Sequence, residues 1–596
     1  MCGIAGIYAY SSSQEVDQAE LSRINDAMTP RGPDGSGQWH SEHSPIGLAH
    51  RRLAIIDPTT TGAQPMRDVE HDLTITYNGE IYNYKELQRY LASKGYHVRT
   101  GSDTEVLLGL YAVDGEAMTE RLRGMYAFAI WDEKRKRLFA ARDPHGIKPF
   151  YFSNDRGVLR FASSIKALLA GGAVSRQLDP AGQVGFLLLG YVPDPFTIRA
   201  AIEALPAGHT LTVELGGEPD IRRFFDIADL LRKQHDAAPV ALEERRARLR
   251  EAMDDTIAHH LVADVPVGFF LSAGVDSTTL IALAAMTGHE HLKTVTLGFD
   301  IYRGTDRDER GLAEAVAKAY GTEHQSIEIG QAEFAGERDR LLHAMDQPSV
   351  DGTNTYFVSR AAVSAGLKTT ISGTGGDEFL QGYPSFTTIP KVVRTVGRLP
   401  GAAIAGGMMR RVAGPLISRM TSPKYASLFE LGTNTGDAYL LRRGLYLPWE
   451  LPSVLDPDIV RVGWERLNLR ARLRDDAADI STLEGQVAAL EMNWYMRGQL
   501  LRDADWAGMA HSLEIRVPLV DRVLLASLAD IVAGPTRLTK LDLASLPDQR
   551  MPDAIRHRKK TGFHVPVRDW LMAESDGPTE RKTRGWARFL LDHVDA

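Results

Sequence analysis

A single cysteine at position two is the first residue whose chemistry needs an explanation. Cys2 is the only cysteine among 596 residues, so an intrachain disulfide and a four-cysteine zinc site are both excluded. Removal of the initiator methionine would leave a thiol and a free α-amino group on one residue, with ordinary pKa values of about 8.5 and about 8. Such a residue can supply both a nucleophile and a base. The alternative for an isolated cysteine is a small, buried apolar side chain.

A segment rich in small residues has the composition of a phosphate-binding loop. It is SAGVDS, which follows the apolar run VPVGFFL and precedes the helix-like TTLIALAAM, and its candidate ligands are Ser272, Ala273, Gly274, Asp276 and Ser277. Backbone amides and the helix dipole both favour an anion at such a turn. The segment lacks GKS or GKT, so it is not a Walker A loop. The alternative is a capped turn that opens a Rossmann-like helix.

A second segment, SGTGGDE, follows the strand-like KTTI and contributes Ser372, Gly373 and Asp377. Asp276 and Asp377 are expected at the ends of two parallel strands, where ligands of open α/β sheets gather. Paired carboxylates suit Mg²⁺ bound to the phosphates of ATP, although each aspartate could instead cap a helix.

The elements that must position these residues change in character along the chain. Up to about residue 205, short apolar or alternating runs such as GIAGIYAY and LTITYNG predict an antiparallel α+β domain. From about residue 240, strands alternate with long helices, which predicts a parallel, doubly wound sheet, and from about residue 385 the pattern is mainly helical. The predicted units are residues 1–205, a linker at 206–239, a second domain at 240–572 and a tail at 573–596.

The bulk composition excludes several classes of protein. Hydrophobic residues make up 43% and charged residues 24%, as in globular proteins, and the net charge of −8 comes without a basic stripe. Nucleic acid is therefore not an expected partner. No apolar run approaches the ~18 residues that span a bilayer, so no membrane association is expected. The N-terminus lacks the features of a secretory signal, and a cytoplasmic location is predicted.

Five segments occur in a fixed order in the N-terminal part: MCGIAGIY, RGPDG, HRRLAIID, NGEIYN and GSDTE. Together they resemble the class II glutamine amidotransferase domain, also called the N-terminal nucleophile glutaminase, which has an αββα fold. The resemblance covers about 200 residues. It implies that Cys2 attacks the amide carbon of glutamine, while Asn78 and the Gly79 amide hold the oxyanion. Preorganised donors of this kind contribute ~2.7 to 4 kcal/mol each.

The same resemblance implies the residues that bind the two charged ends of glutamine. Arg52 would pair with the carboxylate, and Glu80 and Asp103 would bind the α-ammonium group, with Asn78 also in the site. Each residue has an alternative interpretation: Arg52 as a surface cation, Asp103 as a helix N-cap, and Asn78 with Gly79 as a hairpin turn.

SAGVDS and SGTGGDE in one chain resemble the ATP-pyrophosphatase domain of the asparagine synthetase family. MAHSLEIRVPLVD and RKKTGF extend the resemblance to about residue 570. It implies ATP and Mg²⁺ as requirements, Leu297 and Gly298 as adenine contacts, and Lys560 as the cation that stabilises adenylation. The alternative for Lys560 is a solvated surface residue.

The resemblance implies glutamine-dependent amidation of aspartate to asparagine through an acyl-adenylate, which releases AMP, pyrophosphate and glutamate. It also implies a sheltered route for ammonia and a homodimer. Three residues depart from the family pattern, Ala273, Thr374 and Trp506. Another carboxylate, such as a sugar uronate or a secondary-metabolite acid, is the alternative acceptor.

Two other classes of protein are weighed against this interpretation. Phosphoribosyl-pyrophosphate and hexosamine amidotransferases share the glutaminase domain but lack SxGxDS. A binding protein without activity would follow if Ala273 disrupted the phosphate loop.

Overall fold

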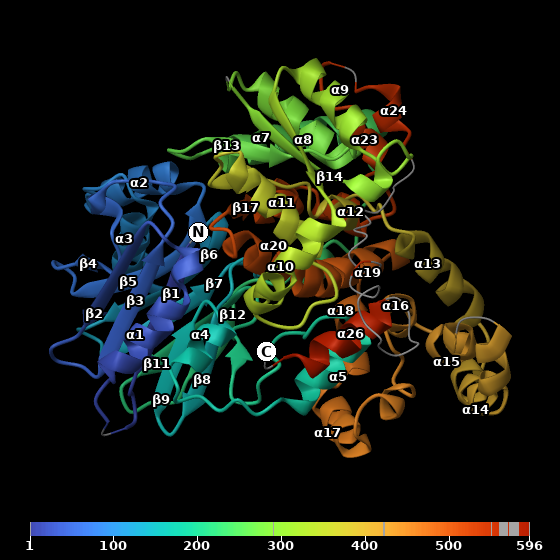
Figure 1. Cartoon of the computed structure of the whole chain (residues 1–596), viewed down its shortest axis with the longest axis horizontal. Coiled ribbons are helices and arrows are strands. Elements are labelled where there is room, and N and C mark those ends of the chain that lie inside the picture. Colours follow the sequence, from blue (N-terminus) through green and yellow to red (C-terminus); the bar gives the residue numbers. More distant parts are fainter. Residues whose placement is uncertain are drawn as a thin grey trace.

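The structure is a computed structural model that describes residues 2–12, 14–289, 291–420, 423–549, 551–558, 570 and 583–594. Lys560, the predicted adenylation lysine, lies outside the described residues. Figure 1 shows the N-terminal domain in blue and cyan on the left, the green elements of the second domain at the top, and its orange elements in the centre and below.

The N-terminal domain contains two antiparallel six-stranded sheets. The first has the strand order β10-β8-β9-β1-β3-β2 and comprises β1 (Gly3–Tyr8), β2 (Gly35–His40), β3 (Ile46–Arg52), β8 (Tyr151–Asp155), β9 (Val158–Ala162) and β10 (Glu203–Ala204). The second has the order β12-β11-β7-β6-β5-β4 and comprises β4 (Met66–Asp68), β5 (Leu73–Ile81), β6 (Gly124–Asp132), β7 (Arg137–Arg142), β11 (His209–Glu214) and β12 (Asp220–Arg223).

Alternation along the strands explains why the two sheets stack between helices. In β1, Ile4 and Tyr8 pack between the sheets, whereas Ala5 and Ile7 lie in the core beneath the helices α1 (Gln18–Ala27) and α4 (Ile165–Ala170). The outer face of the second sheet packs against α2 (Tyr84–Ser93) and α3 (Asp103–Asp114). The four layers confirm the predicted αββα architecture (Figure 1).

The second sheet continues beyond residue 205. β11 pairs with β7, and β12 pairs with β11. The segment predicted as a linker also contains α6 (Ile227–Arg232), whose Ile227 and Leu231 are buried. The hydrogen bonds of these strands therefore place the end of the N-terminal domain near residue 223, and the following segment packs on the protein.

The second domain contains a parallel sheet of five strands in the order β15-β14-β13-β16-β17, which confirms the doubly wound expectation. The strands are β13 (Val267–Phe270), β14 (Lys293–Phe299), β15 (Glu323–Ile329), β16 (Thr369–Ile371) and β17 (Glu514–Arg516). The chain leaves the central strand β13 on one side and returns at β16 on the other. A topological switch point therefore lies at the carboxyl ends of β13 and β16, where ligands bind in such sheets.

Helices flank this sheet and form most of the remaining chain. Those between the strands are α7 (Leu242–His260), α8 (Val275–Met286), α9 (Arg310–Tyr320), α10 (Gln331–Ala344) and α11 (Thr353–Ser364). After β16 come α12 (Gly376–Phe379), α13 (Ser385–Val396), α14 (Ala402–Met420), a 3-10 segment (Pro423–Ser427), α15 (Leu428–Leu431), α16 (Thr435–Arg443), α17 (Pro457–Leu467), α18 (Leu469–Ala477), α19 (Leu483–Leu490), a π-helical stretch (Glu491–Leu501) and α20 (Arg502–Met509). The chain continues with α21 (Arg522–Ser527), α22 (Ala529–Ala533), α23 (Lys540–Ala544), α24 (Asp553–Arg556) and α26 (Thr583–Asp592).

Part of the N-terminal domain packs into the hydrophobic core of the second domain. α5 (Pro180–Leu189), at the end of the first domain, packs against α17, and its side chains belong to the same buried cluster as the parallel sheet. Within the described part of the chain, no helix combines the length and the apolar character needed to cross a membrane. This interdomain packing holds the two candidate reaction centres in a fixed relation.

Candidate active sites

The predicted nucleophile lies at the buried start of β1. The side chain and backbone of Cys2 are together 7% exposed. Its amide donates to Asn78 Oδ1 at 2.8 Å, and its Sγ lies 3.9 Å from the Leu53 carbonyl oxygen. Burial raises the pKa of the Cys2 thiol, and the N-terminal ammonium group opposes that shift. Glu80 and Arg52 also act on this pKa, so both charges lie near the thiol.

The residues predicted to form the oxyanion site lie beside Cys2. Asn78 is fully buried in β5, and its Nδ2 has no hydrogen-bond partner among the described residues. An unpaired buried donor beside a nucleophile suits a charge that develops during the reaction. Gly79 has φ of 155°, and a Cβ there would lie 2.1 Å from the Met125 carbonyl oxygen, so only glycine fits. The structure therefore brings Cys2, Asn78 and Gly79 together.

The predicted glutamine ligands carry the charges that a free amino acid requires. The Arg52 guanidinium donates to the Thr59 carbonyl at 2.6 Å, which holds it on the loop that follows β3. Asp103 accepts from the Tyr77 hydroxyl at 2.9 Å and from the Ile81 amide at 3.0 Å. Burial raises the pKa of Asp103 to about 6 despite these hydrogen bonds. The helix-cap alternative is not realised, because Ser102 caps α3 through the Thr104 amide.

Glu80 meets the second domain. Its Oε2 lies 3.4 Å from Nη2 of Arg516, a fully buried residue of β17. Arg516 also donates to Glu514 at 2.7 Å and to the His260 carbonyl at 2.7 Å. Burial raises the pKa of Glu80 well above its usual range, Glu514 raises it further, and Arg516 opposes the shift. Residues of β17, the edge strand of the parallel sheet, thus influence the protonation of Glu80, a predicted glutamine ligand.

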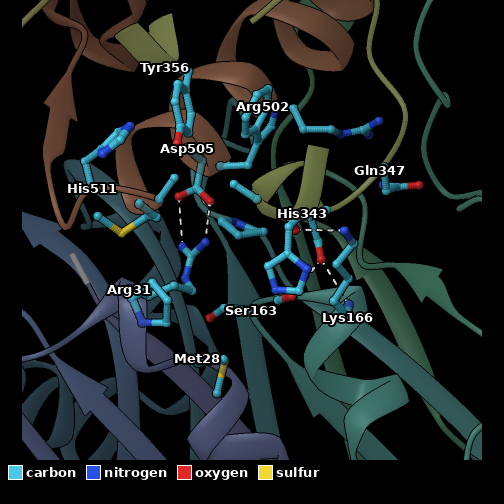
Figure 2. Close-up of a pocket in the computed structure, with 18 of the residues that line it drawn as sticks. Met28, Arg31, Ser163, Lys166, His343, Gln347, Tyr356, Arg502, Asp505 and His511 are labelled. Carbon is cyan, nitrogen blue, oxygen red and sulfur yellow. Dashed lines mark hydrogen bonds and ion pairs between the residues drawn. The ribbon is translucent and has the colours of Figure 1, made fainter. Parts of the chain in front are cut away.

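A second contact between the domains reaches Cys2 directly. Arg31, from RGPDG, donates from Nε to the Cys2 carbonyl at 3.2 Å. Its two terminal nitrogens donate to Asp505 of α20 at 2.8 and 3.0 Å. Figure 2 shows this pair on the wall of an interdomain cavity of about 830 Å³. The two residues are 474 positions apart, so no local signal in the sequence predicts the pair.

The first phosphate loop is closed by its two serines. The Ser277 hydroxyl donates to the Ser272 carbonyl at 3.0 Å, and the two hydroxyl oxygens lie 3.0 Å apart. No side chain caps α8, so its first amides remain available to an anion. Ala273 is fully buried in the hydrophobic core and is not among the residues with positive φ. The alanine therefore packs without strain, and the loop keeps its shape.

The second loop lies against the first. A Cβ at Gly376 would come within 2.7 to 2.9 Å of the Asp276 carboxyl group, so the contact requires a glycine. Together the loops form a cavity of about 340 Å³ at the switch point. We call it the nucleotide cavity. Among the predicted ligands, those that line it are Ser272, Gly274, Asp276, Ser277, Leu297, Ser372, Gly373 and Asp377. Gly298 is not in the lining, because the Arg310 side chain packs over it, and neither is the buried Ala273.

A lysine that the sequence analysis missed lies between the two predicted metal ligands. Lys540, the first residue of α23, forms ion pairs with Asp276 and, at 3.1 Å, with Asp377. Burial alone would lower the pKa of Lys540. The two carboxylates raise this pKa by more than burial lowers it, so the net shift is upward. Nothing in TKLDL distinguishes this lysine from a surface residue. The carboxylates converge on one cation, and this donor set fits Mg²⁺ with phosphate oxygens completing its coordination.

The two other departures from the family pattern lie on different walls. Thr374 lines the nucleotide cavity, where its hydroxyl lies 2.9 Å from that of Ser372. Trp506 instead lines the interdomain cavity and donates to Asp503 at 2.8 Å. Asp503 in turn lines the nucleotide cavity, and burial together with nearby Asp351 raises its pKa to about 7. Trp506 therefore reaches the nucleotide cavity through two lining residues, its hydrogen-bond partner Asp503 and Gly352, against which its ring packs.

Comparisons with known proteins agree with this geometry. Residues 1–225 match the model of the glutamine amidotransferase domain, and residues 248–582, more than half of the chain, match the asparagine synthase model. The chain is 31% identical over 592 residues to "Asparagine synthetase [glutamine-hydrolyzing] 1" of Bacillus subtilis, covering 96% of this chain and 88% of that protein. It is also 31% identical over 599 residues to "Putative asparagine synthetase [glutamine-hydrolyzing]" of Mycobacterium bovis, covering 96% and 89%.

A shorter match involves a relative with a different name. "Amidase chry2" of Gibberella zeae is 30% identical over 415 residues, which cover 65% of this chain and 60% of that protein. The two matched models account for both reaction centres described above. The chain belongs to the asparagine synthase family and is a glutamine-dependent amidotransferase, a carbon–nitrogen ligase that uses ATP.

Proposed function

We propose that the protein releases ammonia from glutamine at Cys2 and transfers it to a carboxylate that ATP activates in the second domain, with aspartate as the first candidate acceptor. The observation that carries this proposal is the chain of contacts between the centres. Arg31 touches the Cys2 carbonyl and holds Asp505, and the adjacent Ala504 lines the nucleotide cavity. Both reactions therefore take place in one buried framework.

In the first reaction, Cys2 Sγ attacks the amide carbon of glutamine. The α-amino group of Cys2, freed by removal of the initiator methionine, takes the thiol proton and passes it to the departing ammonia. Asn78 Nδ2, which has no other described partner, and the Gly79 amide stabilise the oxyanion. Water then cleaves the thioester and releases glutamate. Arg52, Glu80 and Asp103 hold the charged ends of the substrate.

In the second reaction, an oxygen of the acceptor carboxylate attacks the α-phosphorus of ATP. The bond to the β-phosphate breaks, which gives an acyl-adenylate and pyrophosphate. Ser272, Ser277 and the first amides of α8 bind the phosphates. Asp276 and Asp377 would hold Mg²⁺, which neutralises phosphate charge when bound. Ammonia then attacks the acyl carbon and AMP leaves.

The apolar contact between the domains supports a sheltered route for ammonia. Leu53, whose carbonyl lies beside Cys2 Sγ, packs with Ile55 and Met509 in a small buried cluster. Met509 ends α20, the helix that also carries Ala504. Because free ammonia is mostly protonated in neutral water, a route through apolar side chains preserves the nucleophile.

Aspartate is the first candidate because both nearly full-length relatives carry asparagine synthetase names. A different carboxylate is the second candidate, supported by a cavity beyond Asp351 that an aspartate would not fill. The test is mass spectrometry of the protein with glutamine, Mg-ATP and aspartate. Asparagine and AMP in equal amounts would support the first candidate. Glutamate without asparagine or AMP would reject it.

A further inference from the structure

A second cavity adjoins the nucleotide cavity. It has a volume of about 420 Å³ and shares Asp351 with the nucleotide cavity. Two tyrosines form part of the wall between them. Tyr383 lines the nucleotide cavity, Tyr495 lines the second cavity, and their ring centres are 5.8 Å apart. Arg443 packs over both rings, at 4.5 and 3.8 Å from their centres. The cavities are therefore neighbours separated by single side chains.

The charges of the second cavity differ from those of the first. Its lining contains Lys424, Arg443 and Arg584, with Asp351 as the only acidic residue among the lining side chains described. The nucleotide cavity instead has an acidic lining, which includes Asp351, Asp503 and Glu378. An acid that enters the second cavity thus meets three cations and, among the lining side chains described, one carboxylate where the two cavities join.

The cations of the second cavity are fixed in place by groups behind them. Arg443 pairs with the fully buried Glu491 at 2.8 Å, and Arg584 pairs with Glu450 at 2.9 Å. Lys424 donates to the Arg442 carbonyl at 3.1 Å. Burial and the nearby positive charges of Arg442 and Arg584 lower the pKa of Lys424 to about 8. Glu450 opposes this shift.

The size of the second cavity allows a ligand larger than aspartate. Small-molecule sites of ~300 to 1,000 Å³ hold ligands of drug size, whereas aspartate has nine non-hydrogen atoms. The nucleotide cavity already has to hold ATP. An acceptor longer than aspartate therefore has space beyond Asp351, where about 420 Å³ is available.

We infer that the second cavity is an acceptor subsite for an acid longer than aspartate that carries a second anionic group. Its reactive carboxylate lies in the nucleotide cavity, its chain passes Asp351, and its distal anion faces Lys424, Arg443 and Arg584. This inference rests on the proposed amidation and changes only the class of acceptor.

The test compares a homologous series of α-aminodicarboxylates: aspartate, glutamate, 2-aminoadipate, 2-aminopimelate and 2-aminosuberate. Binding is measured by calorimetry with Mg²⁺ and α,β-methylene ATP, which cannot be split between its α- and β-phosphates. Turnover is measured separately as AMP formation with ATP and ammonium chloride, so that the glutaminase is bypassed. We expect affinity to rise with chain length to an optimum beyond aspartate.

Lys424→Met identifies the distal subsite. It should weaken binding of the preferred long acid by about ten-fold, as expected for loss of one charge-assisted hydrogen bond, and leave aspartate within two-fold. The Lys424→Arg variant should restore binding of the long acid. Lys391→Met, which removes an exposed lysine of α13, is the matched control and should change neither. In the unaltered protein, the long acid should also protect Lys424 from acetylation.

The outcomes separate the inference from the proposed function. Affinity that falls steadily from aspartate, or a Lys424→Met variant that binds every acid equally well, would overturn the inference even if aspartate is amidated. Length-dependent binding without AMP formation from any acid would instead reject the proposed reaction and leave the subsite supported.

Discussion

The glutaminase centre and the nucleotide centre differ in how their polar side chains are paired. Beside Cys2, Asn78 Nδ2 is buried without a described partner, and Gly79 allows the strand to approach closely. At the switch point, Asp276 and Asp377 already share the Lys540 ammonium group. In the proposed reaction, the unpaired Nδ2 donor of the first centre is available to a transient oxyanion. The second keeps its carboxylates balanced by a cation and must rearrange when phosphate and metal arrive.

This difference has a physical basis. A neutral amide donor can stay unpaired at a cost of ~1 to 3 kcal/mol, whereas two partly buried carboxylates side by side repel each other. A site for an oxyanion can therefore be built in advance from neutral groups. A site for a metal complex requires a counter-charge, and Lys540 provides one.

The largest expected effect is loss of the glutamine-dependent reaction while the ammonia-dependent reaction continues. Cys2→Ala should lower glutamine-dependent product formation by on the order of 10⁴-fold or more, because no other described group can attack the amide. Ammonium chloride should restore AMP formation to the unaltered rate. Glutamate release and AMP are measured in the same samples. Persistent glutamate release from the variant would remove Cys2 from its role.

The unpaired donor of the first centre can be removed alone. Asn78→Asp keeps an oxygen that can accept from the Cys2 amide but replaces Nδ2. It should lower kcat for glutamine hydrolysis by about 100- to 1,000-fold, or ~2.7 to 4 kcal/mol, with KM little changed. A purely structural role would be indicated if KM rose and kcat did not fall. Asn154→Asp, on β8 away from the thiol, is the matched control.

The counter-charge of the second centre is tested by Lys540→Met. The variant removes the Lys540 ammonium group from between Asp276 and Asp377, and kcat/KM for ATP should fall by about 100-fold, or ~2.7 kcal/mol. Glutamine hydrolysis without ATP should remain within two-fold. Lys540→Arg should recover part of the loss. Unchanged ATP kinetics would show that Lys540 has no part in the reaction.

The acidity of Asp103 predicts a pH effect on the first centre. Its pKa of about 6 lies above the ordinary value, so the carboxyl group becomes neutral as the pH falls through 6. KM for glutamine should therefore rise by about ten-fold between pH 7 and pH 5, the range in which one group with this pKa loses its charge. Asp103→Asn should give a high KM that no longer varies across this range.

The smallest expected effect concerns the link between the centres. Asp505→Asn keeps one acceptor for Arg31 but removes the charge. AMP formed per glutamate released should fall by roughly two-fold, or ~0.4 kcal/mol in the partition of ammonia. Both separate reactions should continue at their usual rates. An unchanged ratio would mean that the ion pair does not guide ammonia.

The order of the elements and the separate loops were predictable from the sequence because they depend on local patterns. Alternating residues in β1 predict a strand buried on both faces, and SAGVDS predicts a turn at a helix start. Asn78 and Gly79 were predictable only through the resemblance. The domain boundary at 205 was misplaced because β11 and β12 join the sheet by long-range pairing.

The remaining site residues were hidden by distance along the chain. Lys540 lies 264 positions from Asp276, and Arg516 lies far from Glu80 in sequence. Lys540 is an ordinary charged residue in its local context, whereas Arg516 lies in MAHSLEIRVPLVD, a segment that carried the resemblance without indicating a role for this arginine. A single sequence contains no local pattern for such partners.

The buried start of β1 has a practical consequence for handling the protein. Because Cys2 is almost inaccessible and its amide is engaged by Asn78, residues added before it would have to occupy the space around the nucleophile. A purification tag fused at that end would cap the amine that serves as base. The protein should therefore be produced with its tag at the other end, or with a tag whose removal exposes Cys2 as the first residue.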